Sequence, residues 1–239
     1  METLNNIVLT IQNYMSNYVL IIALLGAGLW FSFRLGFIQV RGFGEGMRRT
    51  FGGLFSKKGE AGADGMSSFQ ALATAIAAQV GTGNIAGAAT ALAIGGPGAI
   101  FWMWIAAFLG MATIYAEAIM AQKYKTVGAD GQVTGGPVYY IRAAFKGTFG
   151  KVLAGIFAIL ITLALGFMGN AVQSNSIAAS FHTAFGIPQW IMGLVVAVIA
   201  IFVFMGGMKR IAKVTETIVP FMAALYIIGS LIVIIYNYK

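Results

Sequence analysis

Charged residues are absent from four long stretches of this chain, and this pattern predicts its elements. The uncharged stretches hold 31 residues between Glu2 and Arg34, 52 between Asp64 and Glu117, 57 between Lys151 and Lys209, and 22 between Glu216 and Lys239. One α-helix needs about 20 apolar residues to cross a bilayer. The first and last stretches therefore predict one span each, and the two longer ones predict two spans each if a turn divides them.

Both longer stretches contain such a turn. Residues 95–98 read Gly-Gly-Pro-Gly and residues 185–188 read Phe-Gly-Ile-Pro, which are turn sequences. Closely set apolar segments of this length predict a helical bundle rather than a barrel of short alternating strands. We therefore expect an all-α membrane protein whose residues 1–239 form a single transmembrane domain. The six expected spans are 15–33, 67–94, 98–121, 150–181, 188–208 and 214–237.

The distribution of lysine and arginine predicts the orientation. With six spans, 14 of the 15 basic residues fall on one side of the membrane, and only Lys239 falls on the other. Because basic residues favour the cytoplasmic side, the loops 35–66 and 122–149 are expected to be cytoplasmic and the N-terminus external. Within these loops, residues 42–55 and 137–147 have the pattern of interfacial amphipathic helices. The net charge of +8 is then loop charge, and nucleic acid is not an expected partner.

The composition excludes several kinds of chemistry. The chain is 59% hydrophobic and 9% charged, has no cysteine and has one histidine. These numbers exclude disulfides, thiolate catalysis and zinc sites built from several histidines. We expect no cofactor and no catalytic residues. Glu216 lies near the start of the last expected span, where a helix N-terminus favours an anion.

The middle of the second expected span is poor transmembrane sequence. Residues 79–84 read Gln-Val-Gly-Thr-Gly-Asn, which places two glycines and two amide side chains near the bilayer midplane. Unwound backbone survives there only where a cavity or ligand supplies hydrogen-bond partners. A broken helix presents free carbonyl groups that suit a cation and free N–H groups that suit a carboxylate. The alternative is close helix packing, since Gly83 and Gly87 form a small-xxx-small pair.

Four segments, taken in order, resemble the alanine/glycine:cation symporter family, whose members are bacterial and archaeal sodium-coupled carriers of small amino acids. The segments are QVGTGNIAG at 79–87, GGPGAIFWMW at 95–104, YAE at 115–117 and GGPVYYI at 135–141. The resemblance implies a multi-pass protein of a bacterial or archaeal cytoplasmic membrane. Its implied partners are a small amino acid, such as alanine or glycine, and sodium as the coupling ion.

The family is similar to the leucine-transporter fold, which has two inverted repeats of five helices. By that resemblance, 67–94 is the broken first helix of one repeat, 214–237 is its fifth helix, and 15–33 is an extra N-terminal helix. The chain then ends before the second repeat. We therefore expect it to be half of a carrier that does not transport alone.

The resemblance also implies roles for individual residues. The substrate carboxylate would bind around Gly81, Thr82 and Gly83, and the polar residues of 150–181 would face the substrate, among them Asn170 and Gln173. Gln173 is the best candidate there to reach the substrate amino group, although ordinary interhelical hydrogen bonding would also explain it. Sodium would bind mostly to backbone carbonyl groups, and its implied ligands are Ala77, Gln79, Val80 and Asn84.

Two rival functions remain open at this point. One is a non-transporting membrane subunit or a truncated remnant that only packs against another protein. The other is an intramembrane enzyme, which the shortage of metal ligands and acidic partners disfavours. Sodium-dependent binding of alanine distinguishes the carrier from the first rival.

Overall fold

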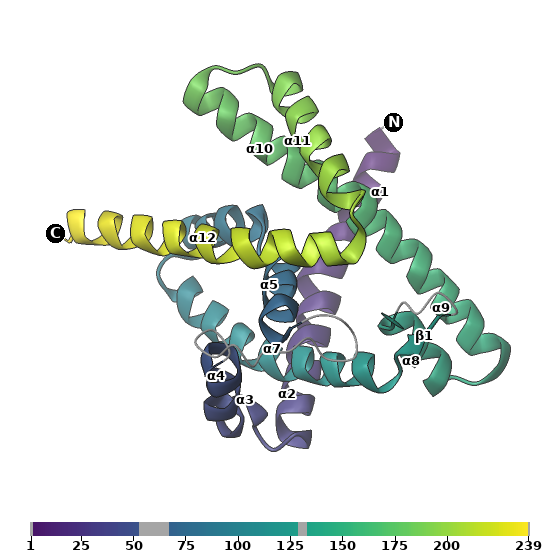
Figure 1. Ribbon diagram of the computed structural model, residues 1–239. Helices are drawn as coiled ribbons and strands as arrows, with labels where there is room; N and C mark the ends of the chain where they lie inside the picture. Colours follow the sequence, from purple (N-terminus) through teal and green to yellow (C-terminus); the bar gives the residue numbers. More distant parts are fainter. Residues whose placement is uncertain (1, 53–66, 129–132, 239) are drawn as a thin grey trace. The chain divides into compact units, whose positions relative to one another are not determined.

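The computed structural model describes residues 2–52, 67–128 and 133–238, and nearly all of them are helical (Figure 1). One small departure from the all-α expectation is an antiparallel pair of two-residue strands, in which Thr126 pairs with Thr134. The elements are α1 (Glu2–Tyr14), η1 (Met15–Leu20), α2 (Ile21–Arg34), α3 (Ile38–Arg41), α4 (Phe43–Gly52), α5 (Ser68–Gln79), η2 (Gly83–Gly87), α6 (Ala88–Gly95), α7 (Gly98–Lys123), β1 (Thr126–Val127), β2 (Val133–Thr134), α8 (Pro137–Ala144), α9 (Gly147–Ile161), η3 (Thr162–Gly169), α10 (Asn170–Phe185), α11 (Gln189–Phe204) and α12 (Gly207–Tyr236).

Four helices of the described chain are long and apolar enough to cross a membrane. They are Thr3–Arg34, Gly98–Lys123, Gly147–Phe185 and Gly207–Tyr236. Two further apolar helices, Gly83–Gly95 and Gln189–Phe204, are shorter than a single span requires. The chain is therefore a helical membrane protein with several spans. Each of these long helices overlaps one of the six predicted segments and extends beyond it at one or both ends.

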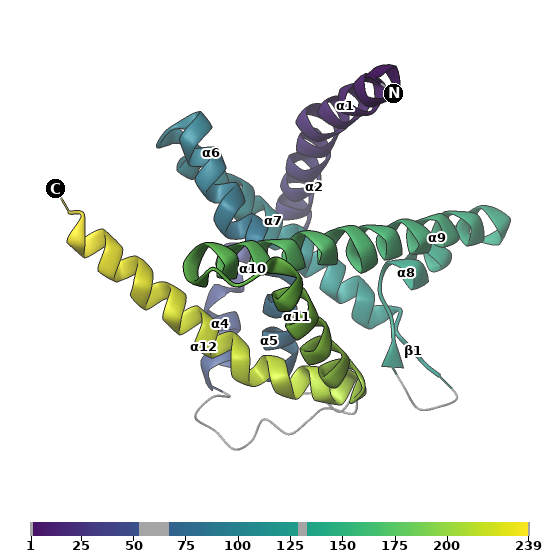
Figure 2. The same cartoon turned by 90° about the horizontal axis from the view of Figure 1, so that it is seen from above.

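The chain divides into two compact units. Unit 1 holds residues 1–45 and 91–159. Within it, α2 lies against α7 (Figure 2), and α3 and α8 also contact α7. The contact between α2 and α7 is close, because a Cβ atom on Gly28 would lie only 2.8 Å from the Cβ atom of Leu109. A small polar cluster lies nearby, where Gln39 donates to the buried hydroxyl of Ser32 at 2.6 Å and to the Phe108 carbonyl at 3.2 Å.

Unit 2 holds residues 46–90 and 160–239, and therefore both parts of the predicted broken helix up to Thr90. Within it, α5 packs against α12, α10 packs against α11, and α11 packs against α12. Small residues are buried on these helices, as is usual where membrane helices pack, and Met192 on α11 and Val219 on α12 are buried as well. Ala73 on α5, Ala178 on α10 and Ala212 on α12 are all buried.

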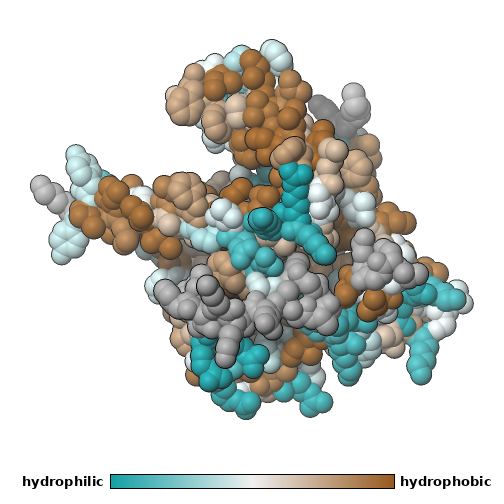
Figure 3. All heavy atoms as spheres, in the orientation of Figure 1, coloured by the Kyte–Doolittle hydropathy of each residue, from teal (hydrophilic) through white to brown (hydrophobic). Residues whose placement is uncertain are grey.

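Large apolar side chains are exposed along most of the helices. Leu231, Ile232, Val233 and Ile234 on α12 are each at least half exposed. Hydrophobic side chains also predominate over the α10–α11 hairpin (Figure 3). A water-exposed protein rarely leaves so much apolar surface open, whereas a lipid-facing surface requires it.

The predicted interfacial helices correspond to short helices outside the candidate spans. Residues 43–52 form α4, and Pro137 begins α8 at the first helical position, where its missing N–H costs nothing. The rest of the first predicted segment, residues 53–55, lies outside the described residues.

Candidate functional site

The helix of residues 67–94 is interrupted where the sequence predicts. The first half-helix, α5, begins with a capping box between Ser67 and Gln70 and ends at Gln79. Val80 then adopts an extended conformation, with φ −90° and ψ 117°. The helix resumes at Thr82, passes through the π-helical turn η2 and continues as α6. Two residues therefore separate the ends of two half-helices.

The first half-helix presents its carbonyl end at the break. Val80 N–H donates to the Ile76 carbonyl at 2.8 Å, and this bond closes α5. The carbonyl groups of Ala77 and Gln79 follow that bond, so they lack the N–H donor that a continuing helix would supply. The carbonyl of Val80 belongs to the break itself. Within the described residues, histidine and carboxylate side chains do not gather in groups of three that could hold a metal. A cation at this site would therefore depend on carbonyl and amide oxygens.

Asn84 folds back onto the beginning of the second half-helix. Its side-chain Oδ1 accepts from Gly81 N–H at 2.9 Å, and its own N–H donates to the Gly81 carbonyl at 3.1 Å. The side-chain oxygen expected to bind sodium thus lies within the break and supports its shape.

Gln173 on α10 reaches the same end of the second half-helix. Its Oε1 accepts from Thr82 N–H at 3.1 Å. A Cβ atom on Gly81 would lie 2.5 Å from Gln173 Nε2, so only glycine allows this approach without a shift of the side chain. The structure therefore brings together four of the predicted site residues, namely Gly81, Thr82, Asn84 and Gln173.

Two other predicted substrate residues are not part of this cluster of contacts. The Asn170 side chain donates to the Gly166 carbonyl of its own helix at 3.1 Å. A Cβ atom on Gly83 would meet no heavy atom of the described residues within 4 Å.

A polar link between α5 and α12 was not predicted. Gln70 Nε2 donates to Glu216 Oε2 at 2.9 Å, and the hydroxyl groups of Thr74 and Thr215 lie 3.1 Å apart. The expectation that Glu216 serves a helix N-terminus is wrong, because α12 begins at Gly207 and Glu216 lies in its third turn. The three-residue spacing of Ser67 and Gln70 is typical of a capping box and could have predicted the start of α5. Nothing local in the sequence indicates the partner on α12.

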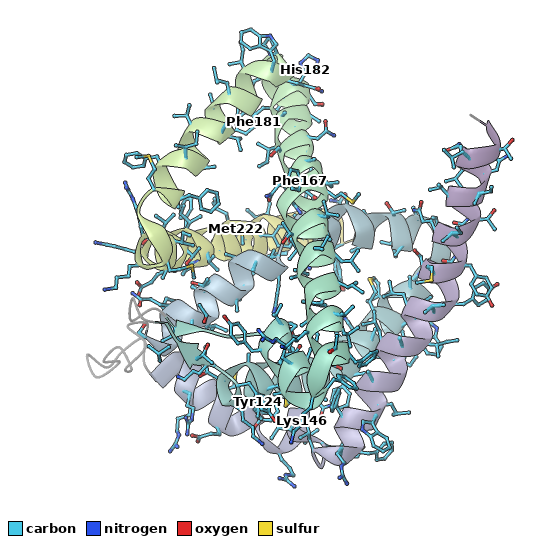
Figure 4. The ribbon with its side chains drawn as sticks, turned by 90° about the vertical axis from the view of Figure 1, so that its right-hand side faces the viewer. Tyr124, Lys146, Phe167, Phe181, His182 and Met222 are labelled. Carbon is cyan, nitrogen blue, oxygen red and sulfur yellow. The ribbon has the colours of Figure 1, made fainter. Side chains whose placement is uncertain are left out.

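Two polar groups lie away from the break. His182 lies near the end of α10, where the chain turns toward α11 (Figure 4), and its Nδ1 is 3.1 Å from the Ile187 carbonyl. Burial, and then the Glu117 carboxylate, raise the pKa of Tyr140 on α8 above its usual value of 10.0. Both arrangements are explained by local structure.

The fold and the break define the class of protein: a helical, multi-pass membrane protein with a discontinuous helix, which is typical of secondary transporters. The model of the sodium:alanine symporter family matches residues 1–239, and the chain belongs to that family. The family is one of transporters rather than enzymes.

Several curated relatives are similar along most of this chain. The sodium/alanine symporter AgcS of Methanococcus maripaludis is 43% identical over 234 residues, which are 97% of this chain and 51% of that protein. The putative sodium/proton-dependent alanine carrier YrbD of Bacillus subtilis is 48% identical over 90% of this chain and 42% of its own length. The probable sodium/glutamine symporter GlnT of the same organism is 42% identical over 99% of this chain and 48% of its own length. The chain thus spans about half the length of the curated relatives it matches.

Proposed function

We propose that this chain supplies one half of a carrier that couples the entry of small neutral amino acids, such as alanine and glycine, to sodium. The observation that carries the proposal is the break at Val80 and Gly81, with a carbonyl end before it and an amide end after it. A helix C-terminus favours a cation and a helix N-terminus favours an anion. One break therefore offers adjacent positions to a sodium ion and to the carboxylate of an amino acid.

In this proposal sodium is held by the carbonyl groups of Ala77, Gln79 and Val80 and by the Asn84 side chain. These are the oxygen ligands that a hard cation prefers. The hydrogen bond from Gly81 N–H to the Asn84 side-chain oxygen supports this role, because it holds that oxygen at the break.

The substrate carboxylate binds at Gly81, Thr82 and Gly83. It is held by the backbone N–H groups of Thr82 and Gly83, while Gly81 N–H holds the Asn84 side-chain oxygen. Gln173 supports this assignment, because its amide oxygen accepts from Thr82 N–H in the way that a carboxylate oxygen would. Asn170, one turn earlier on the same helix, completes the polar side of the site after it releases the Gly166 carbonyl. No covalent step is involved, and transport proceeds by alternating access around the site.

The finer topology is also part of the proposal. The broken helix of residues 67–94, which joins α5 to Gly83–Gly95, and the shorter helix Gln189–Phe204 complete six spans with the four long helices. The first long helix is an extra one, and the other five spans form one repeat of a leucine-transporter-like fold. The basic loops face the cytoplasm, the N-terminus is external, and the membrane is the cytoplasmic membrane of a bacterium or archaeon.

The half of the relatives that this chain does not match would supply the inverted repeat that faces the break. Without it, the ligand sets for sodium and carboxylate are incomplete, and we expect the chain alone not to transport. A parallel pair of identical chains would not supply inverted geometry. An antiparallel pair is disfavoured, because 14 of 15 basic residues share one predicted side.

The test is uptake of radiolabelled alanine into proteoliposomes under an inward sodium gradient. One preparation holds residues 1–239, and the other is a fusion carrier in which the unmatched part of the Methanococcus maripaludis symporter follows these residues. We expect saturable, sodium-dependent uptake in the fusion carrier and none in the chain alone. Glycine and glutamine compete in parallel to rank the substrates. Uptake by the chain alone would overturn the half-carrier proposal, and no uptake by the fusion carrier would favour a non-transporting subunit.

A further inference from the structure

Side-chain oxygens already occupy the positions at which the break would hold a carboxylate. Gly81 N–H donates to Asn84 Oδ1 and Thr82 N–H donates to Gln173 Oε1. A backbone N–H has one hydrogen to donate. A carboxylate that binds Thr82 N–H must therefore displace the Gln173 oxygen.

Asn84 and Gln173 differ in how easily their side chains can move away from these N–H groups. Asn84 is three residues from Gly81, and the reciprocal bond from its own N–H ties it to the local turn. Gln173 comes from α10, 91 residues after Thr82, on a side chain with three rotatable bonds. Gln173 is thus the group that an incoming ligand can replace without undoing the break.

Displacement leaves the Gln173 oxygen without its donor. Gln173 lies within the candidate span Gly147–Phe185, and at membrane depth an acceptor without a donor is costly until another donor reaches it. An α-amino acid brings that donor, because its ammonium group carries three hydrogens next to the carboxylate. A simple carboxylic acid of the same size brings none.

We propose that Gln173 is a specificity-determining residue, an internal competitor for the carboxylate position that yields readily only to ligands that also carry an α-ammonium group. The inference rests on the proposed function and adds to it a reason for selecting amino acids over other small carboxylates. Gly81 also contributes, because a side chain at this position would collide with the Gln173 amide, 2.5 Å from its Nε2.

The experiment compares L-alanine with propionate, which is alanine without its amino group. Binding of both to the fusion carrier is measured in saturating sodium, for the wild type, for Gln173→Ala and for the control Ser180→Ala. The Ser180 hydroxyl bonds only to the Ser176 carbonyl of its own helix among the contacts described for it. In Gln173→Ala we expect stronger propionate binding and weaker alanine binding, so that the ratio of the two affinities falls by about tenfold or more. Ser180→Ala should leave the ratio at the wild-type value.

A second variant is expected to change the ratio of alanine affinity to propionate affinity in the opposite direction, and it keeps a side chain of the same length. In Gln173→Glu a carboxylate replaces the amide, which repels propionate and attracts the ammonium group of alanine. The ratio should therefore rise above the wild-type value. An unchanged ratio in either variant overturns the inference while alanine binding to the wild type stands. Absence of sodium-dependent alanine binding in the wild type overturns the proposed function and this inference together.

Discussion

Glu216 on α12 accepts a 2.9 Å hydrogen bond from the side chain of Gln70 on α5, 146 residues earlier in the chain. Gln70 also accepts from Ser67 N–H at 3.1 Å, so one amide both caps the first half-helix and ties it to α12. The Thr74–Thr215 contact adds a second polar link one turn further along α5. The half-helix that carries the proposed sodium ligands is thus linked to α12 by two polar contacts in its first half.

Removal of the Glu216 carboxylate should loosen α5. Glu216→Ala leaves the Gln70 amide without this acceptor, and we expect unfolding of unit 2 to become easier by about 1–2 kcal/mol. The measurement is thermal unfolding in detergent together with amide exchange along residues 67–79. Thr217→Val is the matched control, because the Thr217 hydroxyl bonds to the Lys213 carbonyl of its own helix. Equal stability of the two variants would show that the link contributes nothing.

A methyl group on Gly81 should displace Gln173. The Cβ atom of Gly81→Ala would lie 2.5 Å from Nε2, the far end of a flexible side chain, so the side chain moves and the helix break survives. We expect alanine affinity of the fusion carrier to fall by about tenfold, because the displaced Gln173 oxygen no longer reaches the ammonium group of the substrate. Gly87→Ala is the control, since its Cβ atom would meet nothing within 4 Å. Wild-type affinity in Gly81→Ala would refute the close approach.

Substitution of Asn84 should abolish sodium-driven uptake. Asn84→Ala removes both the oxygen proposed for sodium and the acceptor for Gly81 N–H. We expect the sodium concentration for half-maximal uptake by the fusion carrier to rise beyond the measurable range, with surface expression little changed. Asn84→Asp, which retains an oxygen at that position, should keep part of the sodium dependence. Thr90→Val on the next helix is the control, because its hydroxyl bonds to Ala86. Unchanged sodium dependence in Asn84→Ala would contradict the assignment.

Tyr140 should ionise at a pH above that of a free tyrosine. Burial of the phenol is the main cause and the charge of Glu117 is the second, so Glu117→Gln should lower the pKa of Tyr140 without restoring the ordinary value. Because the raised pKa favours the neutral phenol, its contribution to stability is complete below the ordinary pKa and is lost as the pH rises through the raised one. The measurement is the phenolate absorbance lost in Tyr140→Phe across an alkaline titration. A Tyr140 pKa that Glu117→Gln leaves unchanged would contradict the electrostatic cause.

The sequence predicts the helical elements and the break because these depend on local composition. Gly81 and Gly83 beside Gln79 and Asn84 weaken a helix at any site, and long uncharged stretches need a lipid environment wherever they occur. The predicted span 188–208 is longer than the helix found, because Gly206 and Gly207 end α11 at Phe204 and Gly207 takes a positive φ of 65°.

Contacts between distant residues were not predictable in the same way. Gln173 was identified as polar and mid-helix, but its bond to Thr82 N–H depends on how α10 packs within unit 2, which no local pattern records. The pairing of Gln70 with Glu216 depends in the same way on the packing of α5 against α12. The β1–β2 pair was missed because two-residue strands leave no periodicity to detect.

The central claim is that sodium and the amino acid bind together at the break, and amide hydrogen exchange at residues 81–84 tests it most directly. Exchange is followed by mass spectrometry in the fusion carrier, reconstituted in nanodiscs, with sodium, with alanine, with both and with neither. The account predicts that sodium and alanine together slow exchange of these amides well beyond the effect of either alone, because each completes part of the other's site. Alanine binding that leaves exchange at residues 81–84 unchanged, in sodium or without it, would contradict the account.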